Sequence, residues 1–494
     1  MAYASKAEAA LEVITKSTLF NEKGYIGGSW VSAKDNKTFP VYNPATDKPI
    51  ANIADFGTAD FQNAISRSQD AFKKFRTTTE HERSRILHKF AALIRSNASL
   101  LAQILTIENG KTIAEAEGEV EYGASFMTWF AEEAIRSYGD IIPSQHAGST
   151  NFVVRQPIGV CAIIAPWNFP IAMITRKLGP ALAAGCTVVI KPPSETPLCT
   201  LALMALAIEA GVPTDVIQVV PTRDRSAVAE LYTNPIVKKV SFTGSTNVGK
   251  LITEKAAGTM KKVSMELGGN APYIVFDDAD LEKAIEGVVA CKYRCSGQTC
   301  VCANRLFVQK GIHDKFVAAL VERVKTFKVG SGLDRSVTHG PLINEAAVTK
   351  VRSHIDDAVS KGAKLVIGGQ ARTDLGKCYI DPAILTGVTT DMLVARDETF
   401  GPLAPIFAFD TVDDVIEMAN DTEFGLAGYF FSQNLETVWR VARELEVGMV
   451  GVNTGKISAA EAPFGGIKES GLGKEGSKYG LSEFQILKNI TLNV

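Results

Sequence analysis

The sequence predicts an α/β protein with two doubly wound units of parallel sheet and a small β element outside them. Between residues 159 and 267, short apolar strands alternate with helical patterns, an order typical of a parallel sheet covered on both faces. A second alternation begins near residue 271 and continues to Met449–Val452. Two further strand-like segments, 142–156 and 484–493, fit neither alternation, and such segments often pair between subunits.

The first unit begins with short β-type runs between residues 24 and 53, separated by turn signals at Gly27-Gly28 and Asn43-Pro44. An amphipathic helix with several Phe residues on one face follows them. The alternation then supplies the sheet, which should bind ligands at the carboxyl ends of its strands. The expected strands are 160–165, 187–191, 217–220, 237–242 and 263–266.

In the second unit, residues 272–276 and 303–308 are expected as strands, and the pattern between them predicts a helix over 281–295. The resulting domain prediction has three parts. We expect a dinucleotide-binding domain from 1–141 and 161–267, a catalytic domain from 268–480, and oligomerisation strands from 142–160 and 481–494. A homodimer or homotetramer follows from this prediction.

Composition excludes several classes of protein. Lys and Arg number 52 against 54 Asp and Glu, so no basic surface for nucleic acid or an anionic membrane is expected. No apolar run approaches the 18 or so residues of a membrane span, and no targeting signal is evident, so we expect a cytoplasmic protein. Four of the eight cysteines fall between 291 and 302, but none forms a C-x-x-C pair, and no metal site is expected.

Two glycine-rich segments resemble nucleotide-binding motifs. Phe242-Thr243-Gly244-Ser245 follows an apolar strand and opens a helix, whose N-terminus suits a pyrophosphate. The segment nearly matches a P-loop, but Leu251 stands where Ser or Thr must hold magnesium, which argues against an NTPase; a plain packing turn is the alternative. The literal G-x-G-x-x-G at residues 471–476 follows no strand, so we interpret it as a loop.

Cys300 and Glu266 carry the chemistry most directly. A cysteine with a lowered pKa is a strong nucleophile, and Glu266, beside Gly268 and Gly269, could act as a general base. Most cysteines are small buried hydrophobes, and most glutamates are solvated, so each residue alone also has an ordinary interpretation. Together they indicate covalent catalysis followed by hydrolysis of the covalent intermediate.

Six short motifs in order resemble the aldehyde dehydrogenase superfamily, with matches running nearly end to end. Residues 173–177, 297–305 and 453–458 are most similar to succinate-semialdehyde dehydrogenases of the fungal and bacterial type. The resemblance implies two Rossmann-like domains, one for the cofactor and one catalytic. The six motifs are Pro166-Trp167-Asn168-Phe169-Pro170, Phe242-Thr243-Gly244-Ser245, Glu266-Leu267-Gly268-Gly269, Gly297-Gln298-Thr299-Cys300, Glu398-Thr399-Phe400-Gly401-Pro402 and Pro463-Phe464-Gly465-Gly466.

The resemblance also implies catalytic and cofactor roles. Cys300 would attack the aldehyde, the side chain of Asn168 and the Cys300 amide would hold the oxyanion, and Glu266 would activate water to release the acid. Glu398 matches the residue that holds the nicotinamide ribose, and Phe400 one that packs near the nicotinamide; a surface acid and a core aromatic are the ordinary alternatives. Further cofactor-binding residues implied by the motifs are Pro166, Trp167, Gly244 and Ser245.

Cofactor choice depends on the segment after the second sheet strand. Lys191 matches the family contact with the adenine ribose, and relatives that prefer NAD usually carry Glu three residues later. Here that residue is Ser194, which is neutral and can donate, so NADP is expected and NAD stays possible. Glu195 weakens the argument, because it could turn toward the ribose.

The resemblance implies oxidation of succinate semialdehyde to succinate, as in 4-aminobutyrate degradation. Arg176 and Arg294 match two arginines that bind the far carboxylate, and Ser458 matches a hydroxyl that assists them. For a lone Arg, a structural ion pair is the ordinary alternative. Glutarate semialdehyde is the alternative substrate, since one methylene discriminates by only about 1–3 kcal/mol.

Cys302 lies two residues after the nucleophile, as in redox-sensitive relatives, and we hypothesise that oxidation joins it to Cys300; a packed structural thiol is the alternative.

Two other functions remain open. A thiol hydrolase using Cys300 would need no dinucleotide, and a non-catalytic binding protein would be expected to have lost Asn168 or Glu266.

Overall fold

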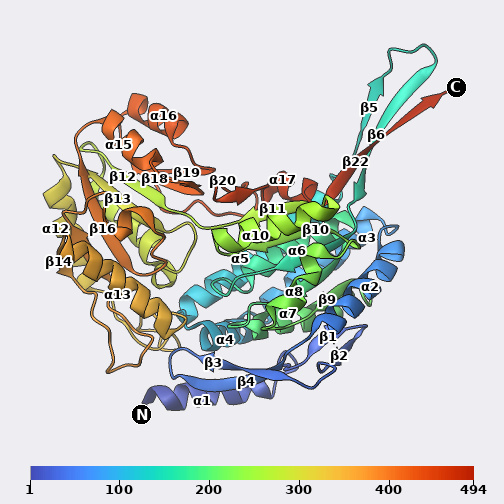
Figure 1. The fold of residues 1–494 in the computed structure, drawn as a ribbon, viewed down its shortest axis with the longest axis horizontal. Coiled ribbons are helices and arrows are strands. Elements are labelled where there is room, and N and C mark those ends of the chain that lie inside the picture. Colours follow the sequence, from blue (N-terminus) through green and yellow to red (C-terminus); the bar gives the residue numbers. More distant parts are fainter. Residues whose placement is uncertain (1) are drawn as a thin grey trace.

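The computed structural model describes residues 2–494, with side chains from residue 6 onward. Two lobes face each other, and a thin three-stranded sheet projects from one of them (Figure 1). Met1, the start of the expected first domain, lies outside the described residues. Both lobes are built on mainly parallel sheets, which confirms the predicted α/β fold class.

The first lobe contains an eight-stranded sheet in the order β2-β1-β9-β8-β7-β10-β11-β21. Its five central strands are parallel, and they correspond to the five predicted strands. The strands in sheet order are β2 (Ser29–Val31), β1 (Gly24–Ile26), β9 (Ile217–Val219), β8 (Thr187–Lys191), β7 (Val160–Ile164), β10 (Val237–Thr243), β11 (Lys262–Glu266) and β21 (Gly471–Leu472). A separate hairpin joins β3 (Thr38–Asn43) to β4 (Lys48–Ala54).

Helices surround this sheet, and several have clear end signals. Thr112 begins α5 through a reciprocal capping box with Glu115, and left-handed Gly185 and Gly211 end α6 and α7. The helices of this lobe are α1 (Ala2–Thr15), α2 (Thr58–Phe75), α3 (Glu80–Ser96), α4 (Ala98–Asn109), α5 (Ile113–Ala134), α6 (Ala172–Ala184), α7 (Pro197–Ala210), α8 (Arg225–Val228), α9 (Glu230–Thr233), α10 (Thr246–Ala256), the 3-10 turn η1 (Ala257–Thr259) and α17 (Ser477–Ser482).

The second lobe contains a seven-stranded sheet in the order β14-β15-β16-β13-β12-β18-β19, in which only β14 runs antiparallel to its neighbour. Its strands are β12 (Ala271–Val275), β13 (Ala303–Gln309), β14 (Lys364–Ile367), β15 (Ala383–Thr386), β16 (Leu403–Phe409), β18 (Ala427–Phe431) and β19 (Met449–Val452). Its helices are α11 (Leu281–Val288), α12 (His313–Lys325), α13 (Glu345–Ser360), α14 (Leu393–Arg396), α15 (Val412–Asn420) and α16 (Leu435–Glu444).

The helix predicted over 281–295 is wrong in its second half. The α-helix α11 ends at Val288 and widens into a π-helical turn, η2 (Val289–Tyr293), followed by a short 3-10 turn, η3 (Arg294–Gly297). Cys295 and Ser296 have positive φ angles of 51° and 52°, which no helix accommodates. This unwinding directs the chain toward Cys300, and π-turns of this kind are frequent at functional sites.

The chain crosses back to the first lobe near its end. Two-residue strands β17 (Phe424–Gly425) and β20 (Ile467–Lys468) pair with each other, and β21 then joins β11. The expected loop at residues 471–476 therefore contains a short strand. Helix α17 packs against α5 and α6, so the chain re-enters the first lobe before residue 480, and the expected domain limits stay a prediction.

The projecting sheet contains β5 (Asp140–Pro143), β6 (Ser149–Pro157) and β22 (Gln485–Asn493) in the order β22-β6-β5 (Figure 1). These are the two segments that fitted neither alternation.

Among residues 2–494, no single helix has the length and apolar composition of a membrane span; α3 and α4, bent by 71°, meet the criteria only as a pair. The described residues contain no cluster of three or more metal-ligating side chains.

Candidate active site

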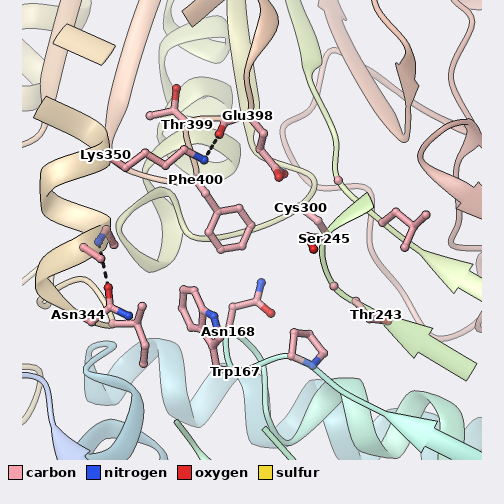
Figure 2. A pocket seen from close by; sticks show the side chains of 17 residues that line it. Trp167, Asn168, Thr243, Ser245, Cys300, Asn344, Lys350, Glu398, Thr399 and Phe400 are labelled. Carbon is pink, nitrogen blue, oxygen red and sulfur yellow. Dashed lines mark hydrogen bonds between the residues drawn. The ribbon is translucent and has the colours of Figure 1, made fainter. Parts of the chain in front are cut away.

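A cavity of about 410 Å³ lies between the lobes and contains most of the predicted cofactor residues. The first lobe contributes the Pro166-Trp167-Asn168 loop and the β10–α10 turn, and the second lobe contributes Cys300 and the 398–400 segment (Figure 2). The predicted residues that line this cavity are Pro166, Trp167, Asn168, Gly244, Ser245, Cys300, Glu398 and Phe400.

Cys300 sits where two glycine contacts bring backbones together. A Cβ on Gly269 would lie 2.7 Å from the Cys300 carbonyl oxygen, and one on Gly297 would lie 2.2 Å from the Gly401 carbonyl oxygen. Only glycine permits these approaches without a shift of the backbone. Burial raises the pKa of the Cys300 thiol to about 12, against the opposing charge of Arg176. In this state the thiol is protonated, so it has to be activated when the reacting groups bind.

Asn168 is aimed at the loop that carries Cys300. Its Nδ2 donates to the Gln298 carbonyl oxygen at 3.0 Å, and the side chain is buried. The backbone carbonyl oxygen of Asn168 accepts from Lys111 Nζ at 2.8 Å. The side-chain amide thus lies beside the Cys300 loop, where a new anionic oxygen could replace the Gln298 carbonyl as its acceptor.

Glu266 ends β11 and is a buried carboxyl group, only 1% exposed. Within the described residues neither of its oxygens has a hydrogen-bond partner. Burial raises its pKa well above the ordinary value, and the charge of Glu475 adds to the rise, while Arg176 and Lys177 oppose it. A raised pKa makes a carboxylate a stronger base once it is ionised.

One wall of the cavity contains Glu398 and Phe400. Glu398 Oε1 accepts from the Gly269 amide at 3.2 Å, and burial raises the pKa of this carboxyl group to about 7. The Phe400 ring packs edge-on to Trp167, with ring centroids 5.6 Å apart. Lys350, which sequence reasoning missed, donates from Nζ to the Glu398 carbonyl oxygen at 2.6 Å (Figure 2).

Ser194 lines a neighbouring cavity of about 360 Å³, and Lys191 lies beside it. Lys191 Nζ donates to Ser194 Oγ at 3.4 Å, and Ser194 Oγ donates to the Thr222 carbonyl oxygen at 3.3 Å. Arg223 and Glu195 line the same cavity. Arg223 was missed by sequence reasoning, although its place just after a parallel strand was a usable signal.

Beside Cys300, the structure brings together Arg176, Arg294 and Ser458. The three line a narrow space of about 20 Å³ beside Cys300. Arg294 and Ser458 also line a wider vestibule of about 280 Å³. Tyr122 lines both spaces, and its buried hydroxyl has no hydrogen-bond partner in the described part of the chain. No motif signalled Tyr122 in the sequence.

The two arginines differ in their surroundings. Arg176 is 1% exposed, forms an ion pair with Glu475, and lies 4.0 Å from the centroid of the Phe464 ring. Arg294 is solvent-exposed at the vestibule and lies 5.2 Å from the centroid of the Phe169 ring. Arg294 is therefore open to a ligand, whereas Arg176 already has a carboxylate partner.

Glu475 connects several of these charges and was also missed by sequence reasoning. It forms ion pairs with Arg176 and Lys177, and their charges hold its pKa below the ordinary value although burial raises it. It lies within the glycine-rich segment 471–476, where the motif drew attention to the glycines and not to the acid.

Cys302 lies in the same loop as Cys300 and is buried. Its Sγ accepts from Thr299 Oγ1 at 3.2 Å and donates to the Lys292 carbonyl oxygen at 3.4 Å. All eight cysteines are free thiols in this structure. The hypothesis of a Cys300–Cys302 disulfide stays a prediction.

Comparison with known proteins gives matches over nearly the whole chain. The model of the "Aldehyde dehydrogenase family" matches residues 30–490. The chain is 50% identical to "Succinate-semialdehyde dehydrogenase [NADP(+)] 1" of Schizosaccharomyces pombe, over 96% of this chain and 95% of that protein. It is 52% identical to a "Glutarate-semialdehyde dehydrogenase" of Pseudomonas aeruginosa, over 96% and 98%. The crystal structure of an Escherichia coli "NADP dependent enzyme" aligns with a TM-score of 0.96 at 50% identity, covering 97% and 99%.

Proposed function

The chain belongs to the aldehyde dehydrogenase family, and we propose that it oxidises succinate semialdehyde to succinate with NADP⁺. One observation carries the choice of substrate. Arg176, Arg294 and Ser458 line the space on the substrate side of Cys300, while the predicted cofactor residues line the opposite cavity. An aldehyde carbon at Cys300 would then extend a terminal carboxylate toward two guanidinium groups, which bind carboxylates well.

The residues of the larger cavity fit a nicotinamide dinucleotide. A Cβ on Gly268 would lie 3.2 Å from Thr246 Oγ1 and 3.3 Å from a Glu398 oxygen, so the glycine keeps this wall of the cavity open. Ser245 precedes the N-terminus of α10, which suits the pyrophosphate. The bound nicotinamide would supply the acceptor for a hydride from the substrate.

The protein's residues divide the chemistry into two stages. The Cys300 thiol releases its proton to solvent as its sulfur bonds to the aldehyde carbon, and the Asn168 side chain and the Cys300 amide would donate to the resulting oxyanion. Loss of the hydride converts this adduct to a thioester on Cys300. Glu266 then takes a proton from water, whose oxygen attacks the thioester carbon, and the acid leaves as the sulfur regains its proton.

The preference for NADP⁺ is supported by Ser194 and Arg223. Ser194 is neutral and lies where an acid would repel a 2′-phosphate, and the Arg223 side chain in the same cavity adds a positive charge. Glu195 also lines this cavity, so use of NAD⁺ remains part of the proposal. The relative from Schizosaccharomyces pombe carries NADP(+) in its name, which agrees with this assignment.

Glutarate semialdehyde is the second candidate substrate. The vestibule of about 280 Å³ beyond the narrow space offers room for one more methylene, and Arg294 lines both spaces. A relative named for that substrate is 52% identical to this chain. Because a methylene changes binding by only about 1–3 kcal/mol, we expect some turnover of both aldehydes.

The test is to follow the absorbance of reduced nicotinamide with succinate semialdehyde, glutarate semialdehyde and propanal, each with NADP⁺ and NAD⁺. We expect the highest kcat/KM with succinate semialdehyde and NADP⁺, and no turnover by Cys300→Ala. Faster turnover of propanal than of both acidic aldehydes would contradict the carboxylate site. Turnover that needs no dinucleotide would instead indicate a thiol hydrolase.

We further propose a homodimer or homotetramer assembled through the projecting sheet, in a cytoplasmic location. Among the described strands, β22 pairs only with β6, and its side chains Ile486, Leu487 and Ile490 are exposed. An open strand edge with apolar side chains is a favourable site for pairing with a second copy. Light scattering coupled to size exclusion would give the subunit number, and deletion of residues 485–494 should yield monomers.

A further inference from the structure

Buried polar side chains that the proposed chemistry does not use lie at the end of α4, in the turn after it and in the first two turns of α5. Glu108 is fully buried, Asn109 is 2% exposed, Lys111 is 3% exposed and Glu119 is 2% exposed. Burying such groups is costly unless they are paired or hydrogen-bonded. Asn109, Lys111 and Glu119 bond to backbone atoms of the loop that carries Asn168, whereas Glu108 accepts from two amides at the start of α7.

Three of these side chains hold the Asn168 loop. Asn109 Nδ2 donates to the Trp167 carbonyl oxygen at 2.9 Å, and Lys111 Nζ donates to the Asn168 carbonyl oxygen at 2.8 Å. Glu119 Oε1 accepts from the amides of Ile171 at 2.9 Å and Ala172 at 3.2 Å, while its other oxygen forms an ion pair with Lys111. The loop is thereby fixed before, at and after Asn168.

Glu115 reaches the other half of the site. Its Oε1 accepts from the Cys295 amide at 2.6 Å, and its Oε2 completes the capping box with Thr112. Cys295 has a φ of 51°, a strained conformation for a residue other than glycine, so this hydrogen bond supports the turn that leads to Cys300. A Cβ on Gly340 of the second lobe would lie 2.0 Å from the Gly110 carbonyl oxygen, so the lobes touch closely here.

The two proposed oxyanion donors come from different lobes. One short segment, residues 111–115, contacts both the loop that carries Asn168 and the turn that leads to Cys300. The Asn168 side chain belongs to the first lobe and the Cys300 amide to the second, and Asn168 already spans the gap by donating to Gln298. Lys111 is charged in this setting: burial lowers its pKa, but Cys295, Glu119 and Glu115 raise it above the ordinary value overall. Such a charged anchor, bonded to both Glu119 and Asn168, can fix relative position more firmly than packing alone.

We propose that Lys111 and Glu115 are positioning residues that align the side-chain amide of Asn168 with the backbone amide of Cys300 across the two lobes. The inference rests on the proposed function, since it assigns a task to the same oxyanion site. In this account, Lys111 anchors the loop of the Asn168 donor, and Glu115 anchors the turn before the Cys300 donor. A displacement of about 1 Å at a reacting centre can cost about 100-fold in rate, so the effect should be measurable.

The first test uses the double variant Lys111→Met/Glu119→Gln, which removes both charges, keeps an acceptor for the Ile171 amide and leaves no unpaired buried carboxylate. Glu115→Ala tests the other anchor, with Glu115→Gln as the conservative variant that still accepts from Cys295. Lys239→Met is the matched control, because Lys239 is also fully buried, donates to Ser264 and pairs with Glu483 outside the site.

Three readouts separate positioning from stability. The single-turnover rate of nicotinamide reduction should fall about 10- to 100-fold in the double variant and in Glu115→Ala. The dissociation constant for NADP⁺ and the rate of Cys300 alkylation by iodoacetamide should change by less than about twofold, since neither needs an oxyanion site. Glu115→Gln should recover most of the lost rate, and Lys239→Met should keep the wild-type rate even if it lowers Tm.

Hydrogen exchange keeps the inference testable apart from activity. The Ile171 and Ala172 amides should exchange faster in the double variant and unchanged in Lys239→Met. Unchanged exchange, or a single-turnover rate within twofold of wild type, would overturn the positioning role even if the wild type oxidises succinate semialdehyde. If none of the tested aldehydes lets the wild type reduce NADP⁺, the proposed function is refuted instead. Faster exchange in the double variant would in that case still support the anchoring contacts.

Discussion

Arg294 should contribute to the recognition of an acidic aldehyde without contributing much to stability. Its side chain is exposed at the vestibule and forms no ion pair within residues 6–494, so replacing it leaves no buried charge unpaired. Hydrogen bonds to charged groups contribute about 1.5–3 kcal/mol each. For an exposed guanidinium we take about 2 kcal/mol, which corresponds to about a 30-fold change in an equilibrium constant.

We therefore expect Arg294→Met to lower kcat/KM for succinate semialdehyde about 30-fold, mainly through KM, and to change kcat/KM for propanal less than twofold. Steady-state nicotinamide absorbance with both aldehydes measures this, and thermal unfolding should show a Tm near that of wild type. Arg176→Met is the contrasting variant, because it leaves Glu475 without one of its two cations and should also lower Tm. Equal losses on both aldehydes in Arg294→Met, or no loss on either, would refute the reasoning.

Three further predictions follow from buried groups. Since the pKa of Cys300 is raised to about 12, its alkylation by iodoacetamide without cofactor should accelerate about tenfold per pH unit from pH 7 to 10; a plateau below pH 9 would contradict this. Glu266→Gln should give one equivalent of NADPH per subunit in a rapid burst and then almost no turnover in stopped-flow absorbance, and steady turnover would exclude its role as base. Glu108 accepts from two amides at the start of α7, and burial raises its pKa from the ordinary 4.5 to about 8. Because the folded state favours the protonated carboxyl, stability should fall as pH rises from about 4.5 to 8. Glu108→Gln should abolish this fall in a plot of Tm against pH, and an unchanged fall would assign it to other groups.

The sequence predicted the sheets well because strands and glycine turns leave local signals. The five central strands of the first sheet could be located by their apolar runs, and the Gly244-Ser245 turn by its place between a strand and a helix. These features depend on neighbours in sequence, and sequence patterns record such neighbours.

The features that sequence reasoning missed depend on contacts between distant segments. Lys111 and Glu475 look like ordinary solvated residues, because charged side chains are seldom fully buried. Their burial depends on partners 57 and 298 residues away, Asn168 and Lys177. The helix expected over 281–295 was wrong for a similar reason, since the left-handed turn there is held by distant contacts, Cys295 with Glu115 and Ser296 with Gly340.

Glu475 would join the proposed substrate recognition and the proposed water activation in one electrostatic unit. It pairs with Arg176 on the substrate side, and its charge helps to raise the pKa of Glu266 on the hydrolytic side. A substrate carboxylate near Arg176 would add a further negative charge to this buried group and draw Arg176 away from Glu475. Both changes would favour the protonated form of Glu266 and weaken it as a base at the thioester stage, when the same carboxylate is still bound, so we expect Arg294 rather than Arg176 to hold the carboxylate. The exposed position of Arg294 fits this account, because a cation without a buried partner can hold the carboxylate without disturbing Glu475.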